Sequence, residues 1–207
     1  MKVAIIFEKY KYIKRYVEKN NYFQIKNQFG TLGFTKQKKH DYLLSVCMGT
    51  SRVINQLSII NKLKYDVIIR IGTCGIIGDQ LNIGEFGIVS KGVNIDAISS
   101  CYLKGSLPLP SDNLNQYLKK HLTLIPVSVF TIDLLDQEID TEADVVDMES
   151  TALLCFGHNY KIKTASISLT RDSLKDKSII LDSDIIIEKI EYITQRVISI
   201  FEQNYFI

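Results

Sequence analysis

The stretch "DVIIRIGTCG", Asp66–Gly75, decides the fold of this chain. Its apolar first half is typical of a buried strand in the middle of a mostly parallel sheet. Arg70 follows the apolar residues, and the two glycines and the threonine after it predict a turn. Ligands of α/β sheets bind where the strands end, so an Arg fork, a hydroxyl and backbone N–H groups indicate an anion site. A surface arginine before a plain turn is the alternative interpretation.

Apolar periodicity elsewhere predicts strands that alternate with helices. The expected strands are 2–7, a hairpin with one strand ending at Thr35 and the other at 42–48, then 66–71, 86–90, 125–130 and 163–170. The expected helices are 10–19, a segment beginning at Thr50 or Ser51 and running to Leu63, then 148–160 and 182–203. This alternation predicts an α/β protein. With three prolines in the chain, no linker or repeat divides it, and residues 1–207 are expected to form a single domain.

Composition excludes several function classes. Hydrophobic residues make up 46% and charged residues 23%, which indicates an ordinary globular protein. The net charge of +2, with lysines scattered along the chain, gives no indication of a nucleic-acid partner. Four widely spaced cysteines without a CxxC pair favour a reducing compartment and no metal site. No stretch approaches the roughly 18 apolar residues of a membrane span, so a cytoplasmic protein without a membrane partner is expected.

Common catalytic motifs are also missing from the sequence. There is no GxGxxG after a strand, no GxxxxGK[ST] and no GxSxG. Three segments remain as candidates. Besides 70–75, these are "DMES" at 147–150, where a carboxylate could accept hydrogen bonds from a vicinal diol, and "SLTRDS" at 168–173, where Asp172 follows a buried strand. Alone, the second could be a plain helix N-terminus and the third a helix cap.

In their order along the chain, the segments resemble the nucleoside phosphorylase superfamily. That family contains purine nucleoside phosphorylases, uridine phosphorylases and methylthioadenosine/adenosylhomocysteine nucleosidases. The resemblance rests on "GTLGFT" (30–35), "MGTS" (48–51), "VIIRIGTCG" (67–75), "DMESTAL" (147–153) and "SISLTRDS" (166–173). It implies one α/β domain with a mixed, partly barrel-like central sheet flanked by helices. The spacing from Glu149 to Asp172 resembles the purine branch.

The resemblance implies phosphorolysis of a purine nucleoside to free base and ribose 1-phosphate, in a pentosyltransferase of purine salvage. Asp172 would be the general acid at purine N7, and Arg70 would hold the attacking phosphate. The remaining roles are phosphate binding by Thr73 and Gly72, ribose binding by Glu149, Met148 and Met48, and base binding by Cys74, Gly75 and Asp172. No metal or organic cofactor is implied, only inorganic phosphate as co-substrate. Shared sites in this family also imply a homo-oligomer, either a hexamer or a dimer.

Departures from the family pattern keep other activities open. The glycine and arginine that normally follow the first strand are replaced by "FEKYKYIKRY" (7–16), and Phe29 stands where the family often has an arginine. Lys9 or Lys11 could supply a point charge to the phosphate instead. Arg171 stands where purine enzymes commonly have serine, and the uridine branch has an arginine in this vicinity. A nucleosidase of the methylthioadenosine/adenosylhomocysteine type, which uses water and an early acidic residue, is an alternative, and Glu8 is the acid near that place. A uridine phosphorylase and a non-catalytic nucleoside-binding homologue are the others.

Overall fold

The computed structural model describes residues 1–207 except 28–29, 95–108, 133–140, 177, 204–205 and 207. Phe29 and Cys101 therefore lie outside the described residues. The strands are β1 (Lys2–Phe7), β2 (Phe23–Asn27), β3 (Gly30–Gln37), β4 (Asp41–Val46), β5 (Val67–Ile76), β6 (Phe86–Gly92), β7 (Ile125–Thr131), β8 (Val145–Asp147) and β9 (Lys163–Ser173). The helices are η1 (Tyr10–Tyr12), α1 (Lys14–Lys19), α2 (Thr50–Lys62), α3 (Asp112–His121), α4 (Ser150–Tyr160) and α5 (Ser183–Gln203).

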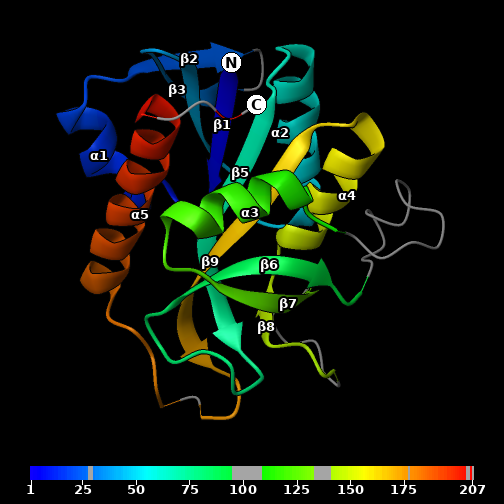
Figure 1. The fold of residues 1–207 in the computed structure, drawn as a ribbon. Coiled ribbons are helices and arrows are strands. Elements are labelled where there is room, and N and C mark those ends of the chain that lie inside the picture. Colours follow the sequence, from blue (N-terminus) through cyan, green and yellow to red (C-terminus); the bar gives the residue numbers. More distant parts are fainter. Residues whose placement is uncertain (28–29, 95–108, 133–140, 177, 204–205, 207) are drawn as a thin grey trace.

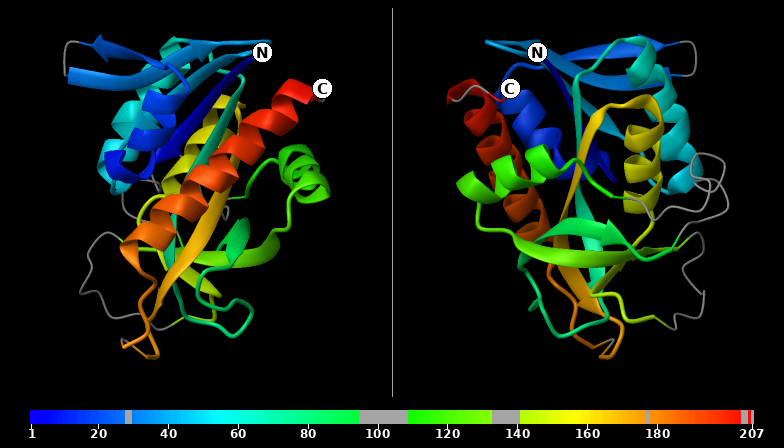
Figure 2. Two further views of the ribbon diagram at one scale, coloured as in Figure 1. Left: turned by 90° about the vertical axis from the view of Figure 1, so that its left-hand side faces the viewer. Right: turned by 45° about the vertical axis from the view of Figure 1, so that its right-hand side comes forward.

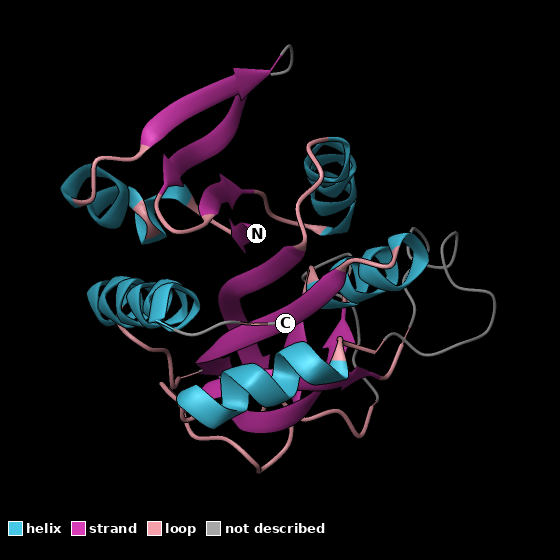
Figure 3. Cartoon of the chain, turned by 45° about the horizontal axis from the view of Figure 1, so that its top comes forward, coloured by secondary structure: helices cyan, strands magenta, loops and turns pink. Residues whose placement is uncertain are grey.

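The nine strands form one mixed sheet in the order β2-β3-β4-β1-β5-β8-β7-β6-β9. Because β9 also pairs with β5, the strands β5, β8, β7, β6 and β9 close into a small barrel. The β2–β3 hairpin lies at the opposite edge of the sheet and projects away from the barrel (Figure 3). The expected α/β domain with a partly barrel-like mixed sheet is confirmed.

Helices cover both faces of this sheet (Figures 1 and 2). One hydrophobic cluster joins α1, α3 and α5 to alternate residues of β1 and β5, including Ile5, Ile69 and Ile71. A second cluster joins α2 and α4 to the intervening residues, including Ile6 and Ile68. All ten residues of β5 are buried, which explains its unbroken apolar first half. Among the described residues, no helix is long and apolar enough to cross a lipid bilayer.

Several expected elements have different bounds. The helix expected at 10–19 is split into η1 and α1 at Ile13, α4 begins at Ser150 rather than at residue 148, and β2 and α3 are additional elements. The turn expected at 70–75 is wrong, because β5 continues through this segment to Ile76. Neither Gly72 nor Gly75 has a positive φ. These glycines allow close approach of neighbouring groups, as described below, rather than a change of chain direction.

Candidate functional site

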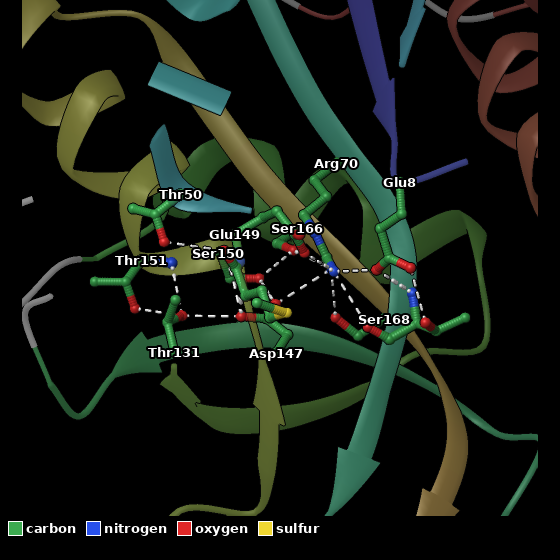
Figure 4. A network of polar contacts seen from close by, with 12 residues as sticks. Glu8, Thr50, Arg70, Thr131, Asp147, Glu149, Ser150, Thr151, Ser166 and Ser168 are labelled. Carbon is green, nitrogen blue, oxygen red and sulfur yellow. Dashed lines mark hydrogen bonds and ion pairs between the residues drawn. The ribbon is translucent and has the colours of Figure 1, made fainter. Parts of the chain in front are cut away.

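Arg70 lies at the centre of a buried polar cluster (Figure 4). Its side chain is 2% exposed, although it projects from the middle of β5. Three carboxylates surround the guanidinium: Nη2 forms ion pairs with Glu8 and, at 2.8 Å, with Glu149, and Nη1 lies 3.2 Å from Asp147. The hydroxyls of Ser166 and Ser168 on β9 and the carbonyl of Thr73 accept further hydrogen bonds. A buried guanidinium with so many acceptors is firmly held in one position.

The cluster has an excess of negative charge. Burial alone would lower the pKa of Arg70, but Asp147, Glu8 and Glu149 outweigh burial and raise it. One guanidinium cannot neutralise three carboxylates, so the fully ionised cluster would carry a net charge of −2 in a region shielded from water. Such a site favours either an additional proton or a cation at its edge.

Glu8 was not among the residues assigned a role by the purine phosphorylase pattern. It follows β1 directly, and the parallel register of β1 and β5 pairs Ile6 with Arg70. Its carboxylate accepts hydrogen bonds from the Thr73 backbone N–H at 2.7 Å and from the Thr73 hydroxyl at 2.8 Å, as well as from Arg70. These are the donors that the sequence assigns to phosphate. The carboxylate of Glu8 takes the place of that anion in the structure.

Gly72 makes this approach possible. A Cβ atom at this position would collide with the Glu8 carboxylate and would lie 2.6 Å from Arg70 Nη2. Gly75 is equally constrained, since a Cβ there would lie 2.9 Å from Asp172 Oδ1 and 2.6 Å from a methyl group of Leu174. Both glycines therefore let charged side chains pack directly against the backbone of β5.

Glu149 occupies the N-cap position of α4 and is 2% exposed. One carboxylate oxygen accepts a hydrogen bond from the Gly49 N–H at 2.6 Å, and the other accepts one from Arg70. Burial raises the pKa of Glu149 to about 7; Arg70 acts in the opposite direction, and the negative charges of Glu8 and Asp147 raise it further. Next to it, Met148 is half-buried, while Met48 at the start of the α2 region is 46% exposed.

Asp147, the other acid of "DMES", fixes the cluster to the scaffold. It accepts hydrogen bonds from the Thr131 hydroxyl at 2.9 Å and from the backbone N–H and the hydroxyl of Ser150. The Ser150 hydroxyl in turn lies 2.7 Å from that of Ser166. Its position beside Glu149 in the sequence was the only signal that could have identified it.

Asp172 lies at the end of β9, opposite Gly75 of β5. Burial raises the pKa of the Cys74 thiol. The negative charges of Asp147, Glu8 and Asp172 raise it further, and the positive charge of Arg70 lowers it. Gly75 faces Asp172, whereas the Cys74 side chain, on the opposite face of β5, packs in a hydrophobic cluster of the barrel with Ile76, Val89 and Leu154.

Tyr12 closes the cluster on the η1 side. It is 3% exposed, and its phenol interacts with the Thr73 side chain. Burial raises its pKa, and the negative charge of Glu8 raises it further, so the phenol stays protonated. Lys11, a proposed substitute for the phosphate arginine, is directed elsewhere: its Nζ donates to the Ser183 hydroxyl at 2.7 Å.

The described residues contain no group of three or more His, Cys, Asp or Glu arranged to hold a metal ion. Where three carboxylates converge, the guanidinium of Arg70 stands between them. Positioned carboxylates of this kind can bind hydroxyl groups, transfer protons and stabilise positive charge.

Comparisons with known proteins identify the family and the fold. The family model described as "Phosphorylase superfamily" matches residues 25–199. A search of curated proteins by sequence found no match.

Solved structures with the same fold include a 5'-methylthioadenosine/S-adenosylhomocysteine nucleosidase from Campylobacter jejuni, with a TM-score of 0.83, 19% identity and coverage of 99% of this chain and 100% of that chain. The S-adenosylhomocysteine nucleosidase from Streptococcus pyogenes matches with a TM-score of 0.76, 20% identity and coverage of 99% and 98%. A futalosine hydrolase from Helicobacter pylori matches with a TM-score of 0.77, 13% identity and coverage of 99% and 100%. Since the family model covers most of the sequence, the chain belongs to the phosphorylase superfamily, the group of nucleoside phosphorylases and nucleosidases.

Proposed function

We propose that this protein hydrolyses the N-glycosidic bond of purine nucleosides, with water rather than phosphate as the acceptor of the ribosyl group. The observation that carries this proposal is the position of Glu8. Its carboxylate accepts hydrogen bonds from the Arg70 guanidinium and from the backbone N–H and hydroxyl of Thr73. The phosphorylase interpretation requires these same donors to bind phosphate.

Electrostatics argue in the same direction. Phosphate carries one to two negative charges at neutral pH, and it would have to enter beside Glu8, Asp147 and Glu149. Like charges in a poorly solvated site repel strongly, and the single guanidinium is already shared among three carboxylates. A water molecule carries no charge and would meet no such barrier. The same carboxylates would stabilise the positive charge that develops on the ribose ring as the bond to the base breaks.

The side chains divide the reaction between them. Glu8, at the end of β1, would orient the attacking water and accept its proton. Glu149 would accept hydrogen bonds from the ribose 2′- and 3′-hydroxyls, with Met148 and Met48 along the sugar. Asp172 would donate a proton to N7, so that the base leaves as a neutral molecule, and Gly75 would lie beside the base. Arg70 becomes a positioning residue that holds Glu8 and Glu149 in place.

The structural relatives support hydrolysis over phosphorolysis, because the three relatives named above carry the names of hydrolases or nucleosidases. The identities are 13–20%, so they support the reaction class rather than a particular substrate.

Purified protein should be incubated with inosine, adenosine and their 5′-methylthio derivatives, with and without phosphate. Base release at the same rate in both conditions, with free ribose or 5-methylthioribose as the product, is the expected result. In water enriched in ¹⁸O, the heavy isotope should appear at C1 of the sugar. Base release that requires phosphate and yields a sugar 1-phosphate would overturn the proposal in favour of phosphorolysis. Tight nucleoside binding without release under any condition would favour a non-catalytic homologue.

A further inference from the structure

Arg171 is the extra residue of a β-bulge beside Asp172. In the parallel pairing of β5 with β9, Cys74 lies opposite Thr170, whereas the next residue, Gly75, lies opposite Asp172. Arg171 therefore has no partner in this ladder. A bulge re-aims the side chains around it, and here Arg171 Nε lies 3.5 Å from Asp172 Oδ2, although adjacent residues of a regular strand point to opposite faces.

The backbone of Arg171 is anchored, whereas its guanidinium is largely available. The Arg171 carbonyl accepts a hydrogen bond from the Leu181 N–H at 2.7 Å. The side chain is 39% exposed, and the long ion pair with Asp172 is its one ion pair among the described residues. This contrasts with Arg70, every terminal nitrogen of which is engaged. A guanidinium has five N–H donors and no acceptor, so Arg171 presents an array of unused donors next to Asp172.

The charge of Arg171 reaches a side chain that borders the polar cluster. The negative charge of Glu8 raises the pKa of the Tyr12 phenol, and the positive charge of Arg171 lowers it. Tyr12 in turn interacts with Thr73, which donates to Glu8. Through its ion pair, Arg171 lies next to Asp172, the residue that would meet the base in the proposed function.

We infer that Arg171 is the residue that selects the base, and that the substrate is a 6-oxopurine nucleoside rather than a 6-aminopurine nucleoside. This inference rests on the proposed function, in which Asp172 faces N7. Position 6 is next to N7 on the same edge of a purine. A group that only donates hydrogen bonds matches a carbonyl oxygen there and does not match an amino group. The same chemistry lets arginine read N7 and O6 of guanine in DNA, whereas adenine is read by asparagine or glutamine.

The test compares kcat/KM for inosine and adenosine, and for their 5′-methylthio derivatives, in the wild-type protein and in Arg171→Gln. The wild-type protein should prefer the 6-oxo member of each pair by about ten- to a hundredfold. Glutamine can both donate and accept, so Arg171→Gln should reduce that preference at least tenfold or reverse it. Arg196→Gln, an exposed arginine on the outer part of α5, is the matched control and should keep the wild-type ratio. Thermal unfolding of both variants checks that they fold.

Binding of the free bases provides a readout that does not depend on turnover. Hypoxanthine should bind the wild-type protein more tightly than adenine by isothermal titration calorimetry, and Arg171→Gln should remove the difference. If hydrolysis occurs but adenosine is preferred, or if Arg171→Gln leaves the ratio unchanged, the inference fails while the proposed function stands. If no nucleoside is hydrolysed but hypoxanthine is still preferred through Arg171, the proposed reaction fails while the base selection stands. Equal binding of both bases overturns the base selection.

Discussion

The Glu8 carboxylate accepts hydrogen bonds from both the backbone N–H and the side-chain hydroxyl of Thr73, at 2.7 and 2.8 Å. Glu8 directly follows β1 and Thr73 lies within the neighbouring parallel strand β5, 65 positions away in the sequence. Together with the ion pair to Arg70, these contacts fix both oxygens of the carboxylate. A carboxylate held in this way is suited to orient one water molecule against a single face of the ribose.

Substitution of Glu8 tests this role directly. Glu8→Gln should reduce kcat by about 10²–10⁴, because the amide cannot accept a proton from water. The KM should change little, since the base and the ribose hydroxyls contact other residues in the proposed complex. Glu18→Gln, an exposed residue of α1, is the control. Formate should partly restore the activity of Glu8→Ala, where space and donors are free, but not that of Glu8→Gln. A wild-type rate in Glu8→Gln would rule Glu8 out as the base.

The pKa of Glu149 predicts how activity depends on pH. Because this pKa is about 7 in the folded protein, the carboxyl group is protonated in acid and ionised above neutrality. Only the ionised form can accept hydrogen bonds from both ribose hydroxyls and stabilise the ribosyl cation. We therefore expect kcat/KM to fall about tenfold per pH unit below about pH 7. A pH profile that stays flat down to pH 5 would contradict this assignment, and Glu149→Gln should abolish the acidic limb along with most of the activity.

The same shift predicts a change in stability. The folded-state pKa of Glu149 is raised from its ordinary value of 4.5, so the folded protein binds the proton more tightly than the unfolded chain does. This contribution to stability is fully present below pH 4.5 and is lost as the pH rises through about 7. Its size is on the order of 3 kcal/mol. Urea denaturation at pH 5 and pH 8 should show Glu149→Gln gaining stability relative to wild type at the higher pH. An unchanged difference between the two proteins would mean that the carboxyl group is not protonated in the fold.

Much of this site could be predicted from the sequence, and the rest depends on contacts between distant segments. The long apolar runs predicted β1, β5 and β9, and β5 and β9 are parallel neighbours in the sheet, with Arg70 opposite Ser166 and Gly75 opposite Asp172. The purine phosphorylase pattern gave Glu8 no role, and only the nucleosidase alternative pointed to it. It lies in a charge-rich segment without periodicity, and its contact with Arg70 follows from the register that pairs Ile6 with Arg70. Gly72 was interpreted as a turn residue for a similar reason. A glycine is required at position 72 because a Cβ atom there would collide with the Glu8 and Arg70 side chains, and no local sequence pattern reveals that contact.

Asp172→Asn separates leaving-group protonation from the other steps. Asparagine cannot donate a proton to N7 in the same way, so kcat for inosine should fall by about 10²–10⁴. A substrate whose leaving group needs no protonation, such as p-nitrophenyl β-D-riboside, should be hydrolysed by the variant at a rate within a few fold of wild type. Asp176→Asn, four residues further along and exposed, is the control. Equal losses on both substrates would show that Asp172 supports the structure of the site rather than acting as the acid.

Tyr12→Phe tests whether the phenol supports Glu8 through Thr73. The change removes only the hydroxyl group that interacts with the Thr73 side chain, and a single hydrogen bond is worth about 0.5–1.5 kcal/mol. We expect kcat to fall by up to about tenfold, with KM little changed, because a less firmly held Thr73 leaves Glu8 less well oriented towards water. Tyr16→Phe is closely matched, since Tyr16 is 4% exposed, belongs to the same hydrophobic cluster and interacts with Tyr22 rather than with the site. Both variants should lose similar thermal stability, but only Tyr12→Phe should lose turnover. Equal turnover in the two variants would show that Tyr12 contributes packing alone, and that Thr73 and Arg70 hold Glu8 without its help.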